Sequence, residues 1–199
     1  MSLSRGVLAL APILTNPFGP DLADLNWRRL KYWRRVVGQA LDPASAPGSA
    51  ESVSEILIDH GPHTFLQAWE LAAWLSRRLG WKVKSGRLQM RVEANWLFAG
   101  PKGETRVRIR RMEKAASEVL RVRLACNVGG KAGALDITLE GENRLAILLE
   151  GVDATARTIT VPPRSPAELV GRQLSDRERD PVFREAMTVV QAMAQLALK

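Results

Sequence analysis

Cysteine and histidine are nearly absent from this chain of 199 residues, which contains one cysteine and two histidines. The single Cys126 excludes an intramolecular disulfide and is typical of a protein in a reducing compartment. His60 and His63 flank a Gly-Pro dipeptide, and two such ligands are too few for a zinc site. With so few nucleophiles and bases available, the sequence predicts a protein that is not an enzyme, without catalytic residues, metal site or cofactor.

A long apolar stretch is also missing. The most hydrophobic segment near the start, residues 7–14, is short and is interrupted by Pro12. It therefore fits neither a transmembrane helix nor a secretory signal. We expect a cytoplasmic protein without a membrane partner, and its composition of 46% hydrophobic and 25% charged residues is ordinary for a globular domain.

Acidic residues are outnumbered, with a formal net charge of +8, and the basic excess is local. Residues 84–123 contain eleven lysines or arginines against four glutamates, whereas charges in the other segments nearly cancel. The charge pattern therefore indicates one basic region rather than a generally basic surface.

Two amphipathic helices are predicted in the first half of the chain, over residues 24–41 and 64–79. In both, apolar residues recur every three or four positions and charged residues occupy the other side. Thr64 and Gln67 have the spacing of a capping box, and Gly80 stands where a left-handed C-cap is expected. Five of the six tryptophans lie within or directly after these helices.

One of these tryptophans, Trp74, is a candidate contact residue. Helical spacing places it on the outward side, between Glu70 and the pair Arg77 and Arg78. A tryptophan left partly exposed beside guanidinium groups is typical of a protein–protein contact. The alternative interpretation is that all five tryptophans, Trp74 included, are core or boundary residues.

From residue 81 onward, apolar residues alternate with polar ones, which is the period of half-buried strands. Short turns, such as Gly129-Gly130, separate these strands and predict an antiparallel meander over residues 81–161. A strand is also predicted at residues 52–59. Two helices, at residues 166–174 and 181–198, close the chain.

These elements predict an α+β fold in which an antiparallel meander sheet is covered on one face by helices. We expect a single domain over residues 21–199, preceded by an N-terminal extension of residues 1–20. The last helix begins with Asp180 as its cap and Pro181 at its first position, and its apolar stripe should cover the inner face of the sheet.

Arginine alternates with apolar residues along the predicted strands, so its side chains should share one outward face of the sheet. The residues concerned are Arg87, Arg91, Arg106, Arg108, Arg110, Arg121 and Arg123. Like charges ~5 Å apart on neighbouring strands repel by roughly 0.8 kcal/mol in water, which indicates an anionic partner. Arginine rather than lysine favours bidentate recognition of carboxylate or phosphate. The alternative is a solvated strand face whose charge prevents edge aggregation.

Nucleic acid is one anionic partner that such a face could bind. Single-stranded platforms need aromatic rings among the charges, but Trp96 and Phe98 fall on inward positions. The sequence also has no helix-turn-helix or zinc-finger pattern. We therefore expect that nucleic acid is not the partner, and keep a nucleic-acid-binding module using the Arg-rich sheet face as the alternative function.

Two sequence blocks resemble a known family. The first is L-N-W-x-R-L-x-x-W-R, followed by D-P, within residues 24–43, and the second is L-A-x-W-L-x-x-R-L-G-W at residues 71–81. Both are similar to the signature of the OpcA family, the bacterial glucose-6-phosphate dehydrogenase assembly proteins. A looser similarity continues to about residue 194. Family members usually carry a longer N-terminal domain than the roughly twenty residues that precede Asp24.

The resemblance implies a non-catalytic accessory protein of the pentose phosphate pathway. It would bind glucose-6-phosphate dehydrogenase, promote its oligomeric assembly and raise its activity, as an allosteric activator does. Our hypothesis is that the Arg-rich face docks on an acidic surface of the dehydrogenase, with Trp74, Arg77 and Arg78 as a second contact.

Overall fold

Helices and alternating strands form an α+β fold, as the sequence predicts. The computed structural model describes residues 6, 8, 9, 24–89, 92–113, 115–151, 156–162, 165–175 and 180–197. The elements are α2 (Leu25–Arg29), α3 (Lys31–Ala40), η1 (Ala50–Ser52), β1 (Glu55–His60), α4 (Phe65–Arg78), β2 (Lys82–Gln89), β3 (Glu93–Gly100), β4 (Gly103–Arg111), β5 (Val119–Val128), β6 (Lys131–Glu140), β7 (Arg144–Glu150), β8 (Arg157–Thr160), α5 (Pro166–Ser175) and α6 (Pro181–Ala197). The predicted N-terminal extension, apart from residues 6, 8 and 9, lies outside the described residues.

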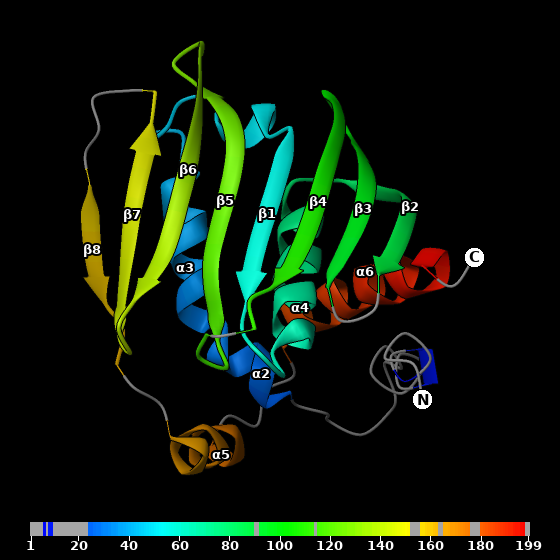
Figure 1. Ribbon diagram of the computed structural model, residues 1–199, viewed down its shortest axis with the longest axis vertical. Helices are drawn as coiled ribbons and strands as arrows, with labels where there is room; N and C mark the ends of the chain where they lie inside the picture. The colour runs from blue at the N-terminus through cyan, green and yellow to red at the C-terminus, as the bar shows by residue number, and fades with distance from the viewer. Residues whose placement is uncertain are drawn as a thin grey trace.

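The strands form one eight-stranded mixed sheet in the order β2-β3-β4-β1-β5-β6-β7-β8 (Figure 1). β1 lies between β4 and β5, parallel to β4 and antiparallel to β5. The other neighbouring pairs are antiparallel. The predicted antiparallel meander is therefore wrong at its centre, where β1 separates β4 from β5. Turn lengths identify hairpins, but they do not reveal a strand that pairs with a distant one across a helix.

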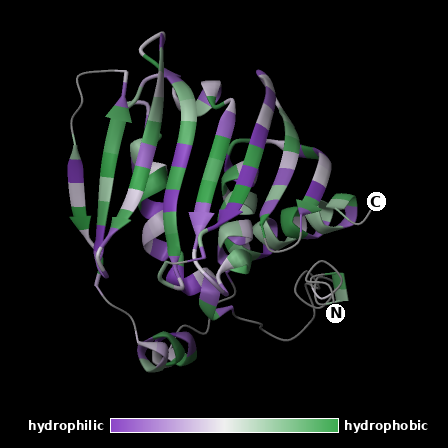
Figure 2. Cartoon of the chain, viewed as in Figure 1, coloured by the Kyte–Doolittle hydropathy of each residue, from purple (hydrophilic) through white to green (hydrophobic). Residues whose placement is uncertain are grey.

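The two faces of the sheet differ in polarity, and Figure 2 shows the alternation of hydropathy along the strands. On one face, Ile58, Phe98, Ile109 and Leu124 are fully buried. Figure 1 shows α3, α4 and α6 behind the sheet, where α4 contacts β1 and β4 and α6 contacts β2. Among the described helices, none lies in front of the sheet in this view.

All six tryptophans are buried, including Trp74 with 8% of its surface exposed. The prediction of an outward-facing Trp74 is therefore wrong. α4 has contacts with β1, β4, α2 and α6, and ten consecutive residues from Gln67 to Ser76 are buried. Because other elements pack around most of this helix, helical spacing alone could not identify a solvent side.

Helix ends agree only in part with the sequence signals. The helix predicted over residues 24–41 is divided at Leu30 into α2 and α3. The capping box at Thr64 is wrong, because its hydroxyl donates to the Gly61 carbonyl at 2.9 Å, while the Gln67 amide donates to Asn26 at 3.1 Å. Gly80 has the expected left-handed conformation, with φ of 72°.

Candidate functional site

We call the side of the sheet opposite α4 the open face, and the strand register assigns its residues. Three rows of side chains cross it from β2 to β6. The Asp59 row is Gln89, Glu93, Arg110, Asp59, Arg121, Thr138. The Leu57 row is Arg87, Asn95, Arg108, Leu57, Arg123, Asp136. The Glu55 row is Ser85, Leu97, Arg106, Glu55, Ala125, Ala134.

The predicted arginines share this face wherever the structure describes them. The six residues are Arg87, Arg106, Arg108, Arg110, Arg121 and Arg123. The seventh, Arg91, lies outside the described residues. Arginines on β4 and β5 are not direct neighbours, however, because β1 lies between the two strands and contributes Glu55 and Asp59 to the same face.

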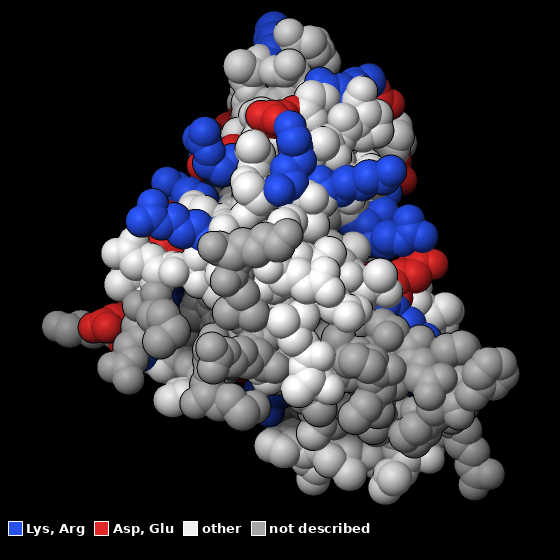
Figure 3. All heavy atoms as spheres, turned by 90° about the vertical axis from the view of Figure 1, so that its right-hand side faces the viewer, with Lys and Arg blue, Asp and Glu red and all other residues white. Residues whose placement is uncertain are grey.

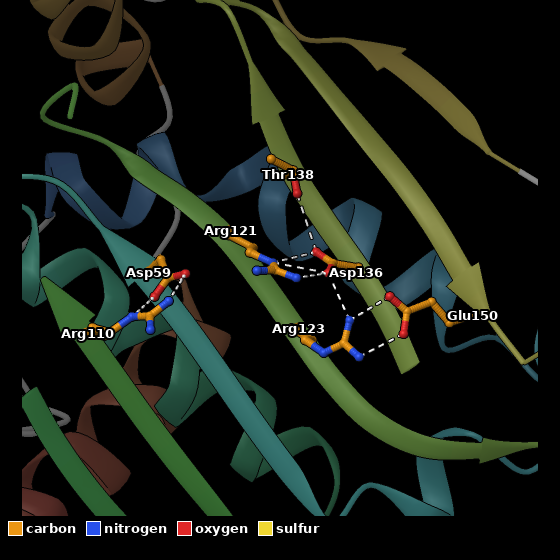
Figure 4. Close-up of polar contacts among 7 residues, drawn as sticks. All are labelled: Asp59, Arg110, Arg121, Arg123, Asp136, Thr138 and Glu150. Carbon is orange, nitrogen blue, oxygen red and sulfur yellow. Dashed lines mark hydrogen bonds and ion pairs between the residues drawn. The ribbon is translucent and has the colours of Figure 1, made fainter. Parts of the chain in front are cut away.

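Asp59 forms a bidentate ion pair with Arg110 (Figure 4). Arg110 donates from Nε to Oδ1 at 2.8 Å and from Nη2 to Oδ2 at 3.0 Å. The Asp59 side chain is only 7% exposed, whereas that of Arg110 is 41% exposed. This geometry is favourable for a charge-assisted pair, and the pair holds the Arg110 guanidinium against the sheet.

A second network joins β5, β6 and β7 (Figure 4). Arg121 donates to both oxygens of Asp136, and Thr138 Oγ1 donates to Asp136 Oδ1 at 3.3 Å. Arg123 donates to Asp136 Oδ2 at 3.1 Å and to both Glu150 oxygens at 2.7 Å. Asp136 therefore bridges two arginines, and each arginine is fixed by at least two hydrogen bonds.

These contacts keep the acidic groups ionised. Burial by itself would raise the pKa of Asp136, but hydrogen bonds from Arg121 and Arg123 outweigh it and hold that pKa below its usual value. The Arg123 hydrogen bond likewise lowers the pKa of Glu150. Asp136 and Glu150 are therefore charged at neutral pH, and the network is an array of paired ions.

The open face is therefore close to neutral, which corrects the expectation of concentrated positive charge. Besides the six arginines, the same face carries Lys82 and Arg144, and against these eight cations stand seven carboxylates, those of Glu55, Asp59, Glu93, Glu104, Asp136, Glu140 and Glu150. Glu55 Oε1 also lies 3.5 Å from Arg108 Nε. The sequence did not reveal this balance in full, because Glu55 and Asp59 come from β1, which had not been placed between the strands that carry the arginines.

A local basic excess remains at the β2 edge of the sheet. Figure 3 faces this edge and shows Lys and Arg over the upper half, with fewer Asp and Glu between them. Lys82, Lys84 and Arg87 of β2 are exposed, and Lys84 forms an ion pair with Glu104. Charged side chains on an edge strand oppose pairing with other strands.

Arg77 and Arg78, predicted as a second contact, are exposed at the end of α4. Arg77 Nε lies 3.3 Å from Glu185 of α6. Trp74 does not join them at the surface, because it is buried. This second candidate surface therefore consists of two arginines without an aromatic anchor.

The structure also contains a buried ionisable cluster that the sequence did not reveal. The Arg34 guanidinium carbon lies 3.4 Å from the centroid of the Trp27 ring, and Trp27 Nε1 donates to Asp180 at 2.7 Å. Glu70 is fully buried, with its carboxyl beside that of Asp24. Burial, and next the nearby Asp24 carboxylate, raise the pKa of Glu70 well above its usual value, although Arg34 acts to lower it.

A hollow of about 420 Å³ lies between α3 and the strands β6 to β8. Its lining is mostly apolar, with Arg157 and Asp42 as its charged groups. The apolar lining includes Val36, Ala40, Leu135, Ile147, Leu149 and Ile159. Gln39 and Ser45 also line it, so the hollow combines apolar and polar groups, as a small-molecule pocket does, whereas a protein partner requires a broad surface such as the open face.

The histidines and the cysteine lack the setting of a reactive site. His60 is buried with Nδ1 2.7 Å from the Gly61 carbonyl oxygen, and burial lowers its pKa. Burial likewise raises the pKa of the Cys126 thiol, which disfavours the reactive thiolate. The described residues contain no group of three or more His, Cys, Asp or Glu suited to a metal ion. No described helix has the length and apolar character needed to cross a bilayer.

Known proteins share this fold. Gal80p from Saccharomyces cerevisiae is 9% identical, with a TM-score of 0.57, over 97% of this chain and 66% of that chain. An oxidoreductase from Sinorhizobium meliloti is 15% identical, with a TM-score of 0.53, over 100% of this chain and 68% of that chain. At such identities, the likeness concerns the fold alone.

Sequence comparison is more specific. A curated relative from a Synechocystis species, named as an OxPP cycle protein OpcA, is 25% identical over 213 residues. The match covers 97% of this chain, which spans 42% of the length of that relative. Residues 20–187 match a family described as the C-terminal domain of the glucose-6-phosphate dehydrogenase subunit. The chain therefore belongs to the OpcA family, of which it carries this C-terminal domain.

Proposed function

We propose that this chain is a non-catalytic accessory protein that binds glucose-6-phosphate dehydrogenase and promotes its oligomeric assembly and activity. Family membership supports the choice of partner. The observation that carries the proposal is the open face, a broad sheet surface without a described helix over it. Its polar groups are held in fixed positions by ion pairs, as a preorganised protein-binding surface requires.

The balance of charge on the open face determines what kind of surface would dock on it. Arg110, Arg121 and Arg123 already bind carboxylates within the chain, so an acidic partner surface would have to compete with these pairs. A surface on which positive and negative groups alternate would instead complement both signs. Leu57 and Leu97, which are half-buried on the face, add apolar area between the ion pairs.

Activation would follow from differential binding. A protein that binds the assembled form of the dehydrogenase more tightly than its separate protomers shifts the equilibrium toward assembly by that difference in affinity. Arg77 and Arg78 are proposed as a second contact, because they are exposed on α4, away from the open face.

The test mixes the chain with the dehydrogenase from the same cell and follows oligomer size and substrate saturation. Replacing Arg106, Arg108 and Arg121 by glutamate should abolish the effect on the enzyme. Arg172→Glu on the exposed surface of α5 is the matched control and should leave the effect unchanged. If the triple variant, folded by circular dichroism, still activates the dehydrogenase, the docking surface lies elsewhere.

Two further arms of this experiment separate the other possibilities. The variant Arg77→Glu/Arg78→Glu measures the second contact. We expect it to activate the dehydrogenase more weakly at low concentrations of the variant, but to the same maximum when the variant is saturating. Random DNA and RNA serve as parallel ligands for the alternative nucleic-acid-binding function. Salt-sensitive DNA binding beside an unaffected dehydrogenase would reverse the proposal.

A further inference from the structure

The charges of the open face are arranged antisymmetrically about the boundary between β4 and β1. In the Asp59 row, Glu93 and Arg110 on one side of this boundary are followed by Asp59 and Arg121 on the other. Outward from the boundary toward β3, the charges are positive at Arg110 and then negative at Glu93. Toward β5 they are negative at Asp59 and then positive at Arg121. A surface with this property is complementary to a copy of itself turned by 180°.

The other two rows each add one pair of opposite charges, while Arg108 and Arg123 of the Leu57 row lie opposite the uncharged Leu57 and Asn95. In the Glu55 row, Arg106 and Glu55 flank the boundary. In the Leu57 row, Arg87 on β2 and Asp136 on β6 are equally far from it. The sheet order places β2 and β6 three strands from the boundary on opposite sides.

We propose that the open face binds a second copy of this chain, through a two-fold axis that runs parallel to the strands over the β4–β1 boundary. Such an axis keeps each row in place and exchanges its two halves. Opposite charges then face each other across the interface, and each contact occurs twice. The facing pairs are Arg106 with Glu55 and Glu93 with Arg121, together with Arg110 with Asp59 and Arg87 with Asp136. Asp59 and Asp136 are buried and paired within the chain, so the first two pairs are the more accessible ones.

Other positions of the axis are less favourable. An axis over β1 places Arg110 opposite Arg121, and one over β4 places Glu93 opposite Asp59, so both bring like charges together. An axis over the boundary between β1 and β5 avoids like charges but forms two kinds of opposite pair instead of four, those of Asp59 with Arg121 and of Arg108 with Asp136. Like-charge juxtaposition disfavours wrong registers, so the charge pattern selects the β4–β1 axis.

The size of the surface fits a dimer. Six strands at ~4.8 Å spacing and about six residues of length give a flat area of roughly 25 Å by 20 Å. Side-chain relief increases the accessible area toward the ~800 Å² that each partner contributes to a standard interface. Leu97 would face Ala125, and Leu57 would face the aliphatic stem of Arg108, which adds apolar contact between the charges.

Self-association is independent of the proposed function, since it is measured without the dehydrogenase. If both hold, the dehydrogenase and the second copy compete for the same face, and the dimer is the free form of the protein. Failure of self-association leaves the effect on the dehydrogenase to be decided by its own experiment.

The test uses one facing pair, Arg106 and Glu55, and measures mass by sedimentation equilibrium or light scattering. Wild type should be a dimer at micromolar concentration and low salt. Arg106→Glu puts two glutamates opposite each other at two symmetric places, and Glu55→Arg does the same with two arginines. We expect each variant to associate at least about tenfold more weakly.

Mixing the two single variants is the decisive step. A copy with glutamate at both positions faces a copy with arginine at both positions, so the mixture should form a heterodimer although each variant alone is a monomer. Loss of folding, checked by circular dichroism, cannot produce this recovery. Arg172→Glu on α5 should remain a dimer. A monomeric wild type, a dimer unaffected by Arg106→Glu, or a mixture that stays monomeric would overturn the proposal.

Discussion

At the residue scale, arginine has two different roles in this chain. Arg121 and Arg123 remain about one-third exposed and bind carboxylates on the open face. Arg34 instead stacks on Trp27 among the helices, where burial lowers its pKa to about 10. Trp27 and Arg34 both belong to the first sequence block of the family signature. The side-by-side Trp and Arg of that block therefore join α2 to α3 within the helix layer.

Glu70, in the same buried cluster, offers a prediction about pH. Its raised pKa means that the folded chain holds this proton while the unfolded chain has lost it, so stability falls as pH rises above the ordinary carboxyl range. The loss is about 1.4 kcal/mol per pH unit until the folded carboxyl also ionises. Glu70→Gln should remove this slope and stabilise the protein at neutral pH.

Urea unfolding of wild type and Glu70→Gln at several values between pH 5 and pH 8 measures the difference. Glu142→Gln, at an exposed position in the turn between β6 and β7, is the control and should follow the wild type. If Glu70→Gln is less stable than wild type at every pH, then the Glu70 charge is stabilised by Arg34 rather than destabilised by burial.

At the element scale, Asp180 connects α2 to α6. Its Oδ1 accepts the Phe183 amide at 3.0 Å, which caps α6, and its Oδ2 accepts Trp27 Nε1 from α2. Asp180→Ala removes both bonds. The lost cap costs about 1–2 kcal/mol, and the unpaired buried indole nitrogen costs on the order of 1–3 kcal/mol.

The free energy of unfolding in urea checks this expectation, with Asp180→Asn as the matched variant. Asparagine has a single accepting oxygen in place of the two that Asp180 uses, so it can keep one of the two hydrogen bonds, and we expect a smaller loss than with alanine. An Asp180→Ala protein as stable as wild type would show that α2 and α6 are not joined through this residue.

The elements also differ in how well the sequence predicts them. Alternation placed Trp96 and Phe98 inward, and both are buried. The same alternation put the arginines of β4 and β5 on one face, because strand parity depends only on local spacing. The position of β1 between these strands depends on its pairing with β4, which is distant in the sequence. The ion pair of Asp59 with Arg110 depends on the same strand pairing, so local spacing could not predict it. The prediction for Trp74 was wrong for a similar reason, because its burial depends on the elements packed around α4.

At the scale of the whole molecule, α3, α4 and α6 lie on one side of the sheet and the ion-pair network lies on the other. Family membership, the open face and its balanced charge together support a protein-binding role for this side. Because the charges are already paired, we expect binding to the dehydrogenase to weaken only moderately with salt, unlike the steep salt dependence of a polyanion-binding surface.

The most direct test of the open face as the docking surface is site-specific photo-crosslinking to glucose-6-phosphate dehydrogenase. A photoreactive side chain in place of Leu57, in β1 at the centre of the face, should form a crosslink of the combined mass when the dehydrogenase is in excess. The same side chain in place of Val170, which is 43% exposed on α5, should not. Crosslinks to the dehydrogenase from position 170 and none from position 57 would contradict the account.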